Sequence, residues 1–208
     1  FPWKIPPGSE YDSGDYQTVL QKALDLAEWD ELTAKRDAAR TEGRLVGLGL
    51  STCLEPGGGN NIFEHLLNEK IQTTTFVESV LMKIDGQGCI TAGIFTTTAG
   101  QGHQTMVATI AGEELERDPD TIRVVHTDSL ESLPTRGPVA SRMTIMLGSA
   151  VGKAARTLKA RMIHIAAHDL GVEDSDIEYA DGEFSVRGAP ERKLGWMGVV
   201  EIAHRQMH

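Results

Sequence analysis

A turn that contains two glycines places the strongest limit on how this chain can fold. The sequence TAGQGHQT, residues 98–105, follows a segment whose composition favours a strand (89–96) and precedes one with helical character (103–116). Where a strand turns directly into a helix, the first N–H groups of the helix are unpaired and the positive end of its dipole is exposed. The sequence therefore predicts a strand–turn–helix unit, which is either a plain connection or an anion-binding site.

The residues of this turn are the first candidate binding site. Glycine adopts backbone conformations closed to other residues and lets a ligand approach the main chain, while the Gln101 amide can both donate and accept hydrogen bonds. The same Gly-Gln-Gly tripeptide recurs at residues 86–88, between two alternating segments and after Asp85, where it predicts a hairpin turn. The candidate site residues are Gly100, Gln101, Gly102 and His103.

A second loop opens onto a helix at residues 133–142, with the sequence LPTRGPVASR. Ser141 would lie in the first turn of a long helix predicted over residues 139–170, and Arg142 or Arg136 would add positive charge beside a phosphate or carbonyl oxygen. The alternative is that the hydroxyl only caps the helix and the prolines mark its boundary. Two helix starts of this kind in one small domain suggest a shared anionic ligand.

The remaining pattern predicts the α+β class, with mostly antiparallel strands and hairpins and with packed helices. Residues 1–43 are interpreted as an N-terminal segment and helices, with Asp15 as the N-cap of a helix from Tyr16, and residues 44–208 as an α+β core. The other expected elements are a buried strand at 45–54, strands at 73–84 and 89–96 joined at 85–88, a strand at 121–127, a hairpin at 177–187 and a helix at 194–208.

Composition excludes several classes of function. Lys and Arg number 20 against 30 Asp and Glu, a net charge of −10, which disfavours binding to nucleic acid or to anionic membranes. No apolar run is long enough to span a bilayer. The two cysteines, Cys53 and Cys89, rule out a disulfide scaffold and are expected to be buried and inert. His164 and His168 have the spacing of a metal pair but lack the glutamate of a zincin, so an ordinary helix face is preferred.

Several motifs, taken together and in order, resemble the large molybdenum-binding subunit of the molybdenum hydroxylases, the family of xanthine dehydrogenase, aldehyde oxidase and aerobic carbon monoxide dehydrogenase. The resemblance spans nearly the whole chain. It rests on FPWK at the start and YDSGDY at 11–16, EPGG at 55–58, Glu78-Ser79, TAGQGHQT at 98–105, VVHTD at 124–128 and PVASR at 138–142.

The resemblance implies a molybdopterin-binding domain of the aldehyde oxidase and xanthine dehydrogenase type. It makes Gly100, Gln101, Gly102, His103, Ala140, Ser141 and Arg142 cofactor contacts. The implied cofactor is molybdopterin with molybdenum, in the cytosine dinucleotide form common in bacterial members. No residue of this chain is expected to ligate the metal. The family's catalytic Glu, a general base, lies well downstream of these motifs, so no catalytic residue is assigned here.

The implied parent is an oxidoreductase that hydroxylates an aldehyde or N-heterocycle, or oxidises carbon monoxide, with oxygen from water. Its electrons would pass to iron–sulfur and FAD subunits or domains. The chain is interpreted as an internal, cytoplasmic fragment that packs against the remainder of its subunit, and alone it is expected to be inactive and to self-associate. If it were active alone, a base would have to come from Glu55, Glu64 or Glu78. The alternative function is a non-catalytic binding or assembly module that holds no metal.

Overall fold

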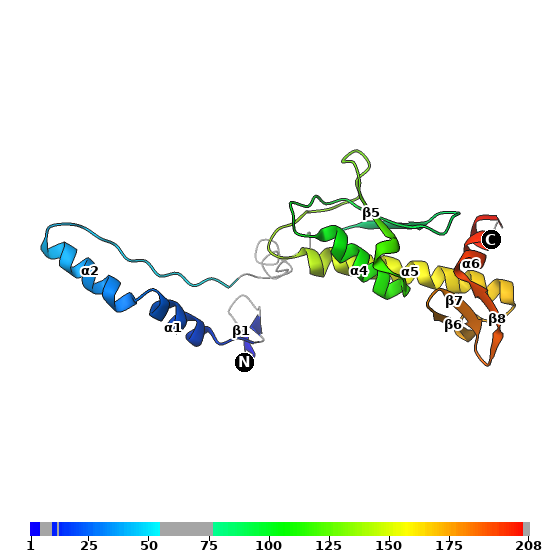
Figure 1. Cartoon of the computed structure of the whole chain (residues 1–208), viewed down its shortest axis with the longest axis horizontal. Coiled ribbons are helices and arrows are strands. Elements are labelled where there is room, and N and C mark those ends of the chain that lie inside the picture. The colour runs from blue at the N-terminus through cyan, green and yellow to red at the C-terminus, as the bar shows by residue number, and fades with distance from the viewer. Residues whose placement is uncertain (5–9, 12, 55–76, 206–208) are drawn as a thin grey trace. The chain divides into compact units, whose positions relative to one another are not determined.

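The computed structural model describes residues 1–4, 10–11, 13–54 and 77–205. Contacts divide the chain into two compact units, and the described residues up to 54 belong to the first and those from 77 to the second (Figure 1). The EPGG motif, Glu64 and the first part of the strand expected at 73–84 lie outside the described residues.

The first unit contains two short strands and two helices. Strands β1 (Trp3–Lys4) and β2 (Glu10–Tyr11) pair antiparallel, and helices α1 (Tyr16–Leu26) and α2 (Trp29–Thr41) follow. Asp15 caps α1 as predicted, because its carboxylate accepts a hydrogen bond from the Thr18 N–H at 3.1 Å. The helical segment is divided in two because Glu28 takes a left-handed conformation, with φ of 50°.

The buried strand predicted at residues 45–54 is wrong. These residues form no regular secondary structure and are almost all exposed; Leu45, for example, is 95% exposed. Among the described residues of the first unit only Ala39 is buried, so this apolar segment has no core to pack against. Cys53 is therefore exposed, contrary to prediction, and so is Cys89 in the second unit.

The second unit begins with a sheet of three strands in the order β3–β4–β5. Strands β3 (Val80–Ile84) and β4 (Ile90–Ile94) form the predicted hairpin. In its turn, the Asp85 carboxylate accepts hydrogen bonds from the N–H groups of Gln87 and Cys89. Strand β5 (Ile122–His126) runs parallel to β4, because helix α4 (His103–Leu115) and the short 3-10 helix η1 (Pro119–Thr121) carry the chain back to the start of the sheet.

The long helix α5 (Met143–Leu170) leads to a second small sheet. After the 3-10 turn η2 (Asp174–Asp176), strands β6 (Ile177–Ala180) and β7 (Glu183–Val186) form the predicted hairpin. Strand β8 (Ala189–Gly195) adds a third strand that the sequence did not predict, since its Pro-Glu-Arg-Lys stretch is exposed and lacks apolar alternation. Helix α6 (Trp196–Arg205) follows it. Apart from the parallel β4–β5 pair, every strand pair is antiparallel among the described residues, as the α+β class predicted.

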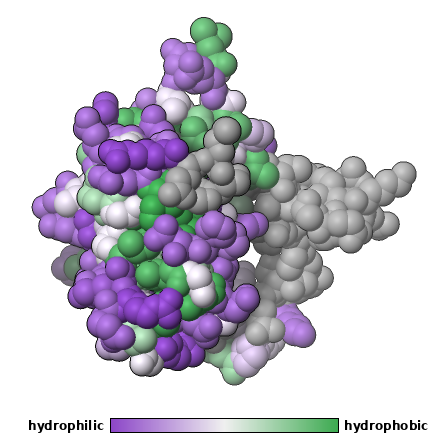
Figure 2. Space-filling model, turned by 90° about the vertical axis from the view of Figure 1, so that its right-hand side faces the viewer, coloured by the Kyte–Doolittle hydropathy of each residue, from purple (hydrophilic) through white to green (hydrophobic). Residues whose placement is uncertain are grey.

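Helix α5 joins the parts of the second unit, since it runs along the β3–β5 sheet and on to the β6–β8 sheet (Figure 1). The core contains fully buried side chains from both sheets and the helices, and α4 and α5 contribute Val107, Ala111, Leu115, Leu147, Val151 and Ala155. On the face that carries α6 and the β6–β8 sheet, Figure 2 shows polar side chains with smaller apolar areas between them. None of the helices in the described ranges is long and apolar enough to cross a membrane.

Candidate functional site

The two loops that the sequence singled out meet at one cavity of about 430 Å³ in the second unit. Helices α4 and α5 pack against each other, and residues at the start of each helix line the cavity. The α4 junction contributes Gln101, His103 and Met106, and the α5 junction contributes residues 138–144. Of the predicted site residues, Gln101, His103, Ala140, Ser141 and Arg142 line the cavity, and Gly100 and Gly102 flank Gln101.

Neither helix that begins at the cavity is neutralised at its start. Both α4 and α5 lack a capping side-chain hydrogen bond and an acidic residue in the first turn. The helices of the first unit differ: Asp15 caps α1, and α2 carries Asp30 and Glu31 in its first turn. None of the described residues that line the cavity carries a carboxylate, although the chain has a net charge of −10. The cavity therefore combines two positive helix ends and suits an anion.

The backbone of both loops takes conformations that most residues avoid. Gly100 and Gly102 have φ of 102° and 73°, and a Cβ atom added at either would meet no atom within 4 Å. The backbone conformation thus favours glycine at both positions, while the space beside the turn stays open. Ala140 and Ser141 are left-handed as well, with φ of 50° and 51°. Strained conformations of this kind cost about 1–3 kcal/mol each and tend to occur at ligand-binding sites.

His103 carries a buried polar atom that needs a partner. The residue is only 4% exposed, and its Nδ1 atom has no hydrogen-bond partner among the described residues. Leaving a buried polar atom unsatisfied costs about 1–3 kcal/mol, so a group bound in the cavity would recover this loss. The neighbouring Gln101 orders its own turn, since its amide oxygen accepts from the Ala99 N–H at 2.6 Å and from the Thr98 hydroxyl at 3.2 Å.

The sequence placed the charge of Arg142 beside a bound anion, but the structure places its side chain in the interior. Its side chain is fully buried and forms an ion pair with the equally buried Glu78. The guanidinium also donates to the carbonyl oxygens of Gly137, at 2.8 Å, and Val77, at 3.3 Å. Arg142 therefore ties the loop before α5 to the segment that enters β3, and its charge is not presented at the cavity surface.

Glu78 completes this network. Its carboxylate accepts hydrogen bonds from the Thr135 hydroxyl and from the N–H groups of Gly137, at 3.0 Å, and Arg136, at 3.2 Å. Burial alone would raise the pKa of Glu78, but the hydrogen bonds from Thr135, Arg142 and the two N–H groups outweigh it and hold the pKa below its usual value. Through these contacts Glu78 holds the loop before α5, and a carboxylate whose ionised form has this many donors is a weak proton acceptor.

The lowered pKa of Glu78 predicts acid sensitivity. Folding favours the ionised form, so the folded protein binds fewer protons here than the unfolded chain. The resulting stabilisation is fully present above the ordinary pKa of 4.5 and is lost as the pH falls through the lower pKa of the folded state. We expect Glu78→Gln to flatten the fall in unfolding free energy below this pH, measured by urea unfolding. The exposed Glu178→Gln is the control. An equal slope for Glu78→Gln and the wild type would contradict the assignment.

Sequence reasoning missed Glu78 as the partner of Arg142, since the two lie 64 positions apart and no local pattern connects them. It also did not identify Thr144 as a residue of the cavity lining. The position of this hydroxyl in the first turn of α5 could have indicated it. Of the histidine pair on α5, His164 contacts Asp174 at 3.0 Å, and the part of the chain that the structure describes holds no cluster of three metal-binding side chains.

Comparison with known proteins identifies the family that this chain resembles. A family model described as "Molybdopterin cofactor-binding domain" matches residues 22–208. The carbon monoxide dehydrogenase large chain of Hydrogenophaga pseudoflava is 34% identical over 192 residues, which cover 90% of this chain and 23% of that protein. The nicotine 6-hydroxylase large subunit of Paenarthrobacter nicotinovorans is 28% identical over 194 residues, which cover 93% of this chain and 23% of that protein.

The fold is similar as well. The crystal structure of the Cu,Mo-CO dehydrogenase matches with a TM-score of 0.64 and 32% identity, over 98% of this chain and 25% of that one. The chain thus spans about a quarter of the length of these relatives.

Proposed function

Because the chain belongs to the molybdopterin cofactor-binding domain family of the molybdenum hydroxylases, we propose that the cavity at the starts of α4 and α5 binds the molybdopterin cofactor. The observation that carries this proposal is the convergence of two uncapped helix starts on one cavity that also holds the unsatisfied Nδ1 of His103. A pterin with a phosphate or dinucleotide tail offers negative charge and many polar atoms, which fits these donors.

Each part of the site has a distinct task in this proposal. The free N–H groups at the starts of α4 and α5 donate to the anionic part of the cofactor, and Gly100 and Gly102 let it approach the main chain. The Nδ1 atom of His103 and the hydroxyl of Ser141 provide further hydrogen bonds. Arg142 is a positioning residue, since it acts through the loop that presents Ala140 and Ser141. When bound, the molybdenum cofactor would supply the two-electron redox chemistry.

For the whole subunit we propose the activity of the family: hydroxylation of an aldehyde or N-heterocycle, or oxidation of carbon monoxide, with oxygen from water. Since no carboxylate is found among the described residues of the cavity lining, we propose that the general base comes from elsewhere in the subunit. Electrons would leave through iron–sulfur and FAD partners. The cytosine dinucleotide form of the cofactor and a cytoplasmic location are part of the same proposal.

The test is the molybdenum and pterin content of the large subunit that contains this chain. We expect near-stoichiometric content in the wild type and at least a tenfold loss in Gly102→Val, because its side chain would occupy the space beside the turn and Gly102 has a φ of 73°. His103→Leu should lower retention as well, since it removes the buried donor or acceptor at Nδ1.

The matched control is Gly171→Val, which has a similar φ of 65° but lies at the far end of α5. It should cost a comparable amount of stability and leave the cofactor content unchanged. Absence of molybdenum and pterin from the wild type would favour the non-catalytic assembly module instead. Equal loss in both glycine variants would show that the effect is one of stability alone.

A further inference from the structure

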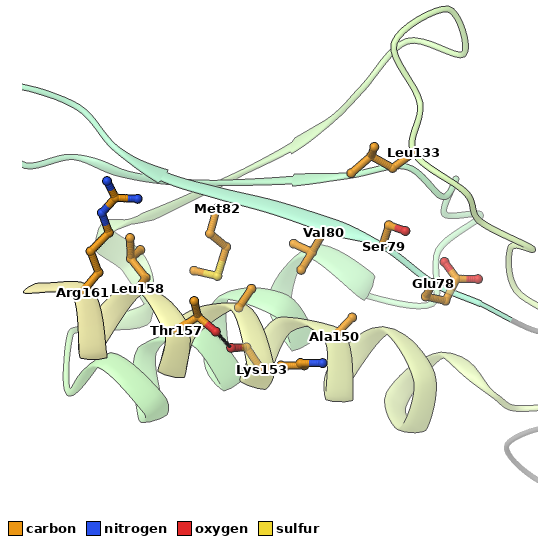
Figure 3. A pocket seen from close by; sticks show the side chains of 11 residues that line it. Glu78, Ser79, Val80, Met82, Leu133, Ala150, Lys153, Thr157, Leu158 and Arg161 are labelled. Atoms are coloured by element: carbon orange, nitrogen blue, oxygen red, sulfur yellow. Dashed lines mark hydrogen bonds between the residues drawn. The ribbon is translucent and has the colours of Figure 1, made fainter. Parts of the chain in front are cut away.

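A second hollow, of about 550 Å³, lies between β3 and α5 and shares no lining residue with the cavity at the helix starts. We call it the β3–α5 groove (Figure 3). In Figure 3, β3 crosses above α5 and the two run in the same direction, with Val80 and Met82 turned toward the helix. The groove residues are Glu78, Ser79, Val80, Met82 and Leu133 on the upper side and Ala150, Lys153, Ala154, Thr157, Leu158 and Arg161 on α5.

One edge of β3 has no partner strand. The Asp85 N–H donates to the Cys89 carbonyl oxygen at 3.1 Å, so in this antiparallel ladder alternate residues direct their hydrogen-bonding groups away from β4. These outward residues are Val80, Met82 and Ile84. The Nε2 atom of His204 lies 3.1 Å from the Ile84 carbonyl oxygen and covers that end. Within the described ranges, the outward N–H and C=O groups of Val80 and Met82 have no partner, which makes this edge a template for another strand.

The floor of the groove matches a strand in length. Its α5 residues, from Ala150 to Arg161, lie three and four positions apart and so form one stripe along the helix. At about 1.5 Å per residue the stripe is about 16 Å long. A strand of about five residues has the same length at about 3.3 Å per residue. Small and apolar side chains, Ala150, Ala154 and Leu158, leave room for the inward side chains of such a strand.

Two positively charged side chains of the groove, Lys153 and Arg161, indicate which charges a strand bound there would carry. Within the described parts of the chain, neither Lys153 nor Arg161 has an acidic partner, while the only carboxylate of the groove, Glu78, is paired with Arg142. The two cations lie eight positions apart on α5, about 12 Å. Residues i and i+4 of a strand point to the same side about 13 Å apart. Two acidic residues at that spacing, with an apolar residue midway over Ala154 and Leu158, would fit the groove.

We propose that the β3–α5 groove holds an extended segment of the same large subunit, added beside β3 as a fourth strand with the pattern acid–x–apolar–x–acid. The contact surface consists of only two edge residues of β3 and one short stripe of α5. It is far smaller than the ~800 Å² that each partner buries in a stable interface between separate proteins. A covalently linked segment overcomes this through its high effective concentration. The relatives supply such sequence, since this chain spans 23% of their length. The inference does not depend on cofactor binding.

The first test uses the 208-residue chain and two capped heptapeptides, TDTVTET and TKTVTKT, titrated to millimolar concentration by NMR. We expect the acidic peptide to shift and protect the amides of Val80 and Met82, and the basic peptide to bind at least tenfold more weakly. The double variant Lys153→Glu/Arg161→Glu should reverse this preference. Arg123→Glu, on the other edge strand of the same sheet, is the matched control and should keep it. No response at Val80 and Met82, or a preference that the double variant leaves unchanged, would overturn the proposal.

The second test identifies the source of the strand by amide hydrogen exchange of the large subunit. We expect the Val80 and Met82 amides to exchange at least tenfold more slowly in the isolated large subunit than in the 208-residue chain. If these amides became protected only after other subunits were added, the assignment of the strand to the same subunit would be overturned. It would also be overturned if they exchanged equally fast in the isolated large subunit and in the 208-residue chain. Both tests can fail while the large subunit still retains cofactor in the cavity at α4 and α5. Both can also succeed if the large subunit retains no cofactor.

Discussion

Replacing Arg142 with methionine is expected to lower the free energy of unfolding by about 3–5 kcal/mol. The substitution removes the ion pair with the buried Glu78 and two hydrogen bonds to the carbonyl oxygens of Gly137 and Val77. An unpaired buried carboxylate must then either stay charged without compensation or take up a proton. Denaturant unfolding followed by circular dichroism measures the loss.

Two further variants separate the buried pair from general effects of losing an arginine. Arg156→Met breaks the more exposed ion pair with Glu114 and should cost less than about 1 kcal/mol. The double variant Arg142→Met/Glu78→Gln removes both buried charges while the glutamine amide oxygen can still accept hydrogen bonds, so it should recover part of the loss. A single variant as stable as the wild type, or a double variant less stable than Arg142→Met, would contradict this account of the network.

The second large effect is expected at Phe184, in the middle strand of the β6–β8 sheet. Its side chain is 0% exposed and its ring lies 4.7 Å from that of Tyr179, measured between centroids. Phe184→Ala removes this packing and leaves a cavity, so we expect a loss of about 3–5 kcal/mol in unfolding free energy. Thermal unfolding followed by circular dichroism or calorimetry would record the change.

The control for this prediction is Phe1→Ala in the first unit, where the side chain is 65% exposed. It removes the same atoms without creating a buried cavity and should change the unfolding free energy by less than about 0.5 kcal/mol. If the Phe184→Ala variant unfolded at the same temperature as the wild type, the β6–β8 sheet would contribute little to the stability of the second unit. An intermediate loss with a separate, earlier transition would show that this sheet unfolds independently of α5.

These predictions bear on function because the Arg142–Glu78 pair also shapes the candidate cofactor site. The pair holds the loop that carries Ala140 and Ser141 in their left-handed conformations. Loss of the pair should therefore lower cofactor retention by the large subunit even where the protein stays folded. Arg142 would then act on the cofactor through loop geometry and not through its charge.

Local sequence determined those elements whose signals are local. The Asp85–Gly88 turn, the cap at Asp15, the helix that starts at His103 and the hairpin around Asp181-Gly182 follow from residues a few positions apart, and all four were predicted. The order of the motifs along the chain also predicted the family, which the match over residues 22–208 confirms. Turns, caps and helix starts depend on the backbone preferences of neighbouring residues, so one sequence is enough to find them.

Tertiary structure alone decided whatever depends on contacts between distant segments. The apolar stretch 45–54 reads as a strand, but without a partner strand or a core in the described first unit it stays irregular and exposed. Strand β8 has the composition of a loop and becomes a strand because β7 offers it an edge. Arg142 reads as a cation at a helix start, yet Glu78, 64 positions away, draws it into the interior. The free energies of pairing and burial depend on which segments meet, and that information does not lie in any short window of sequence.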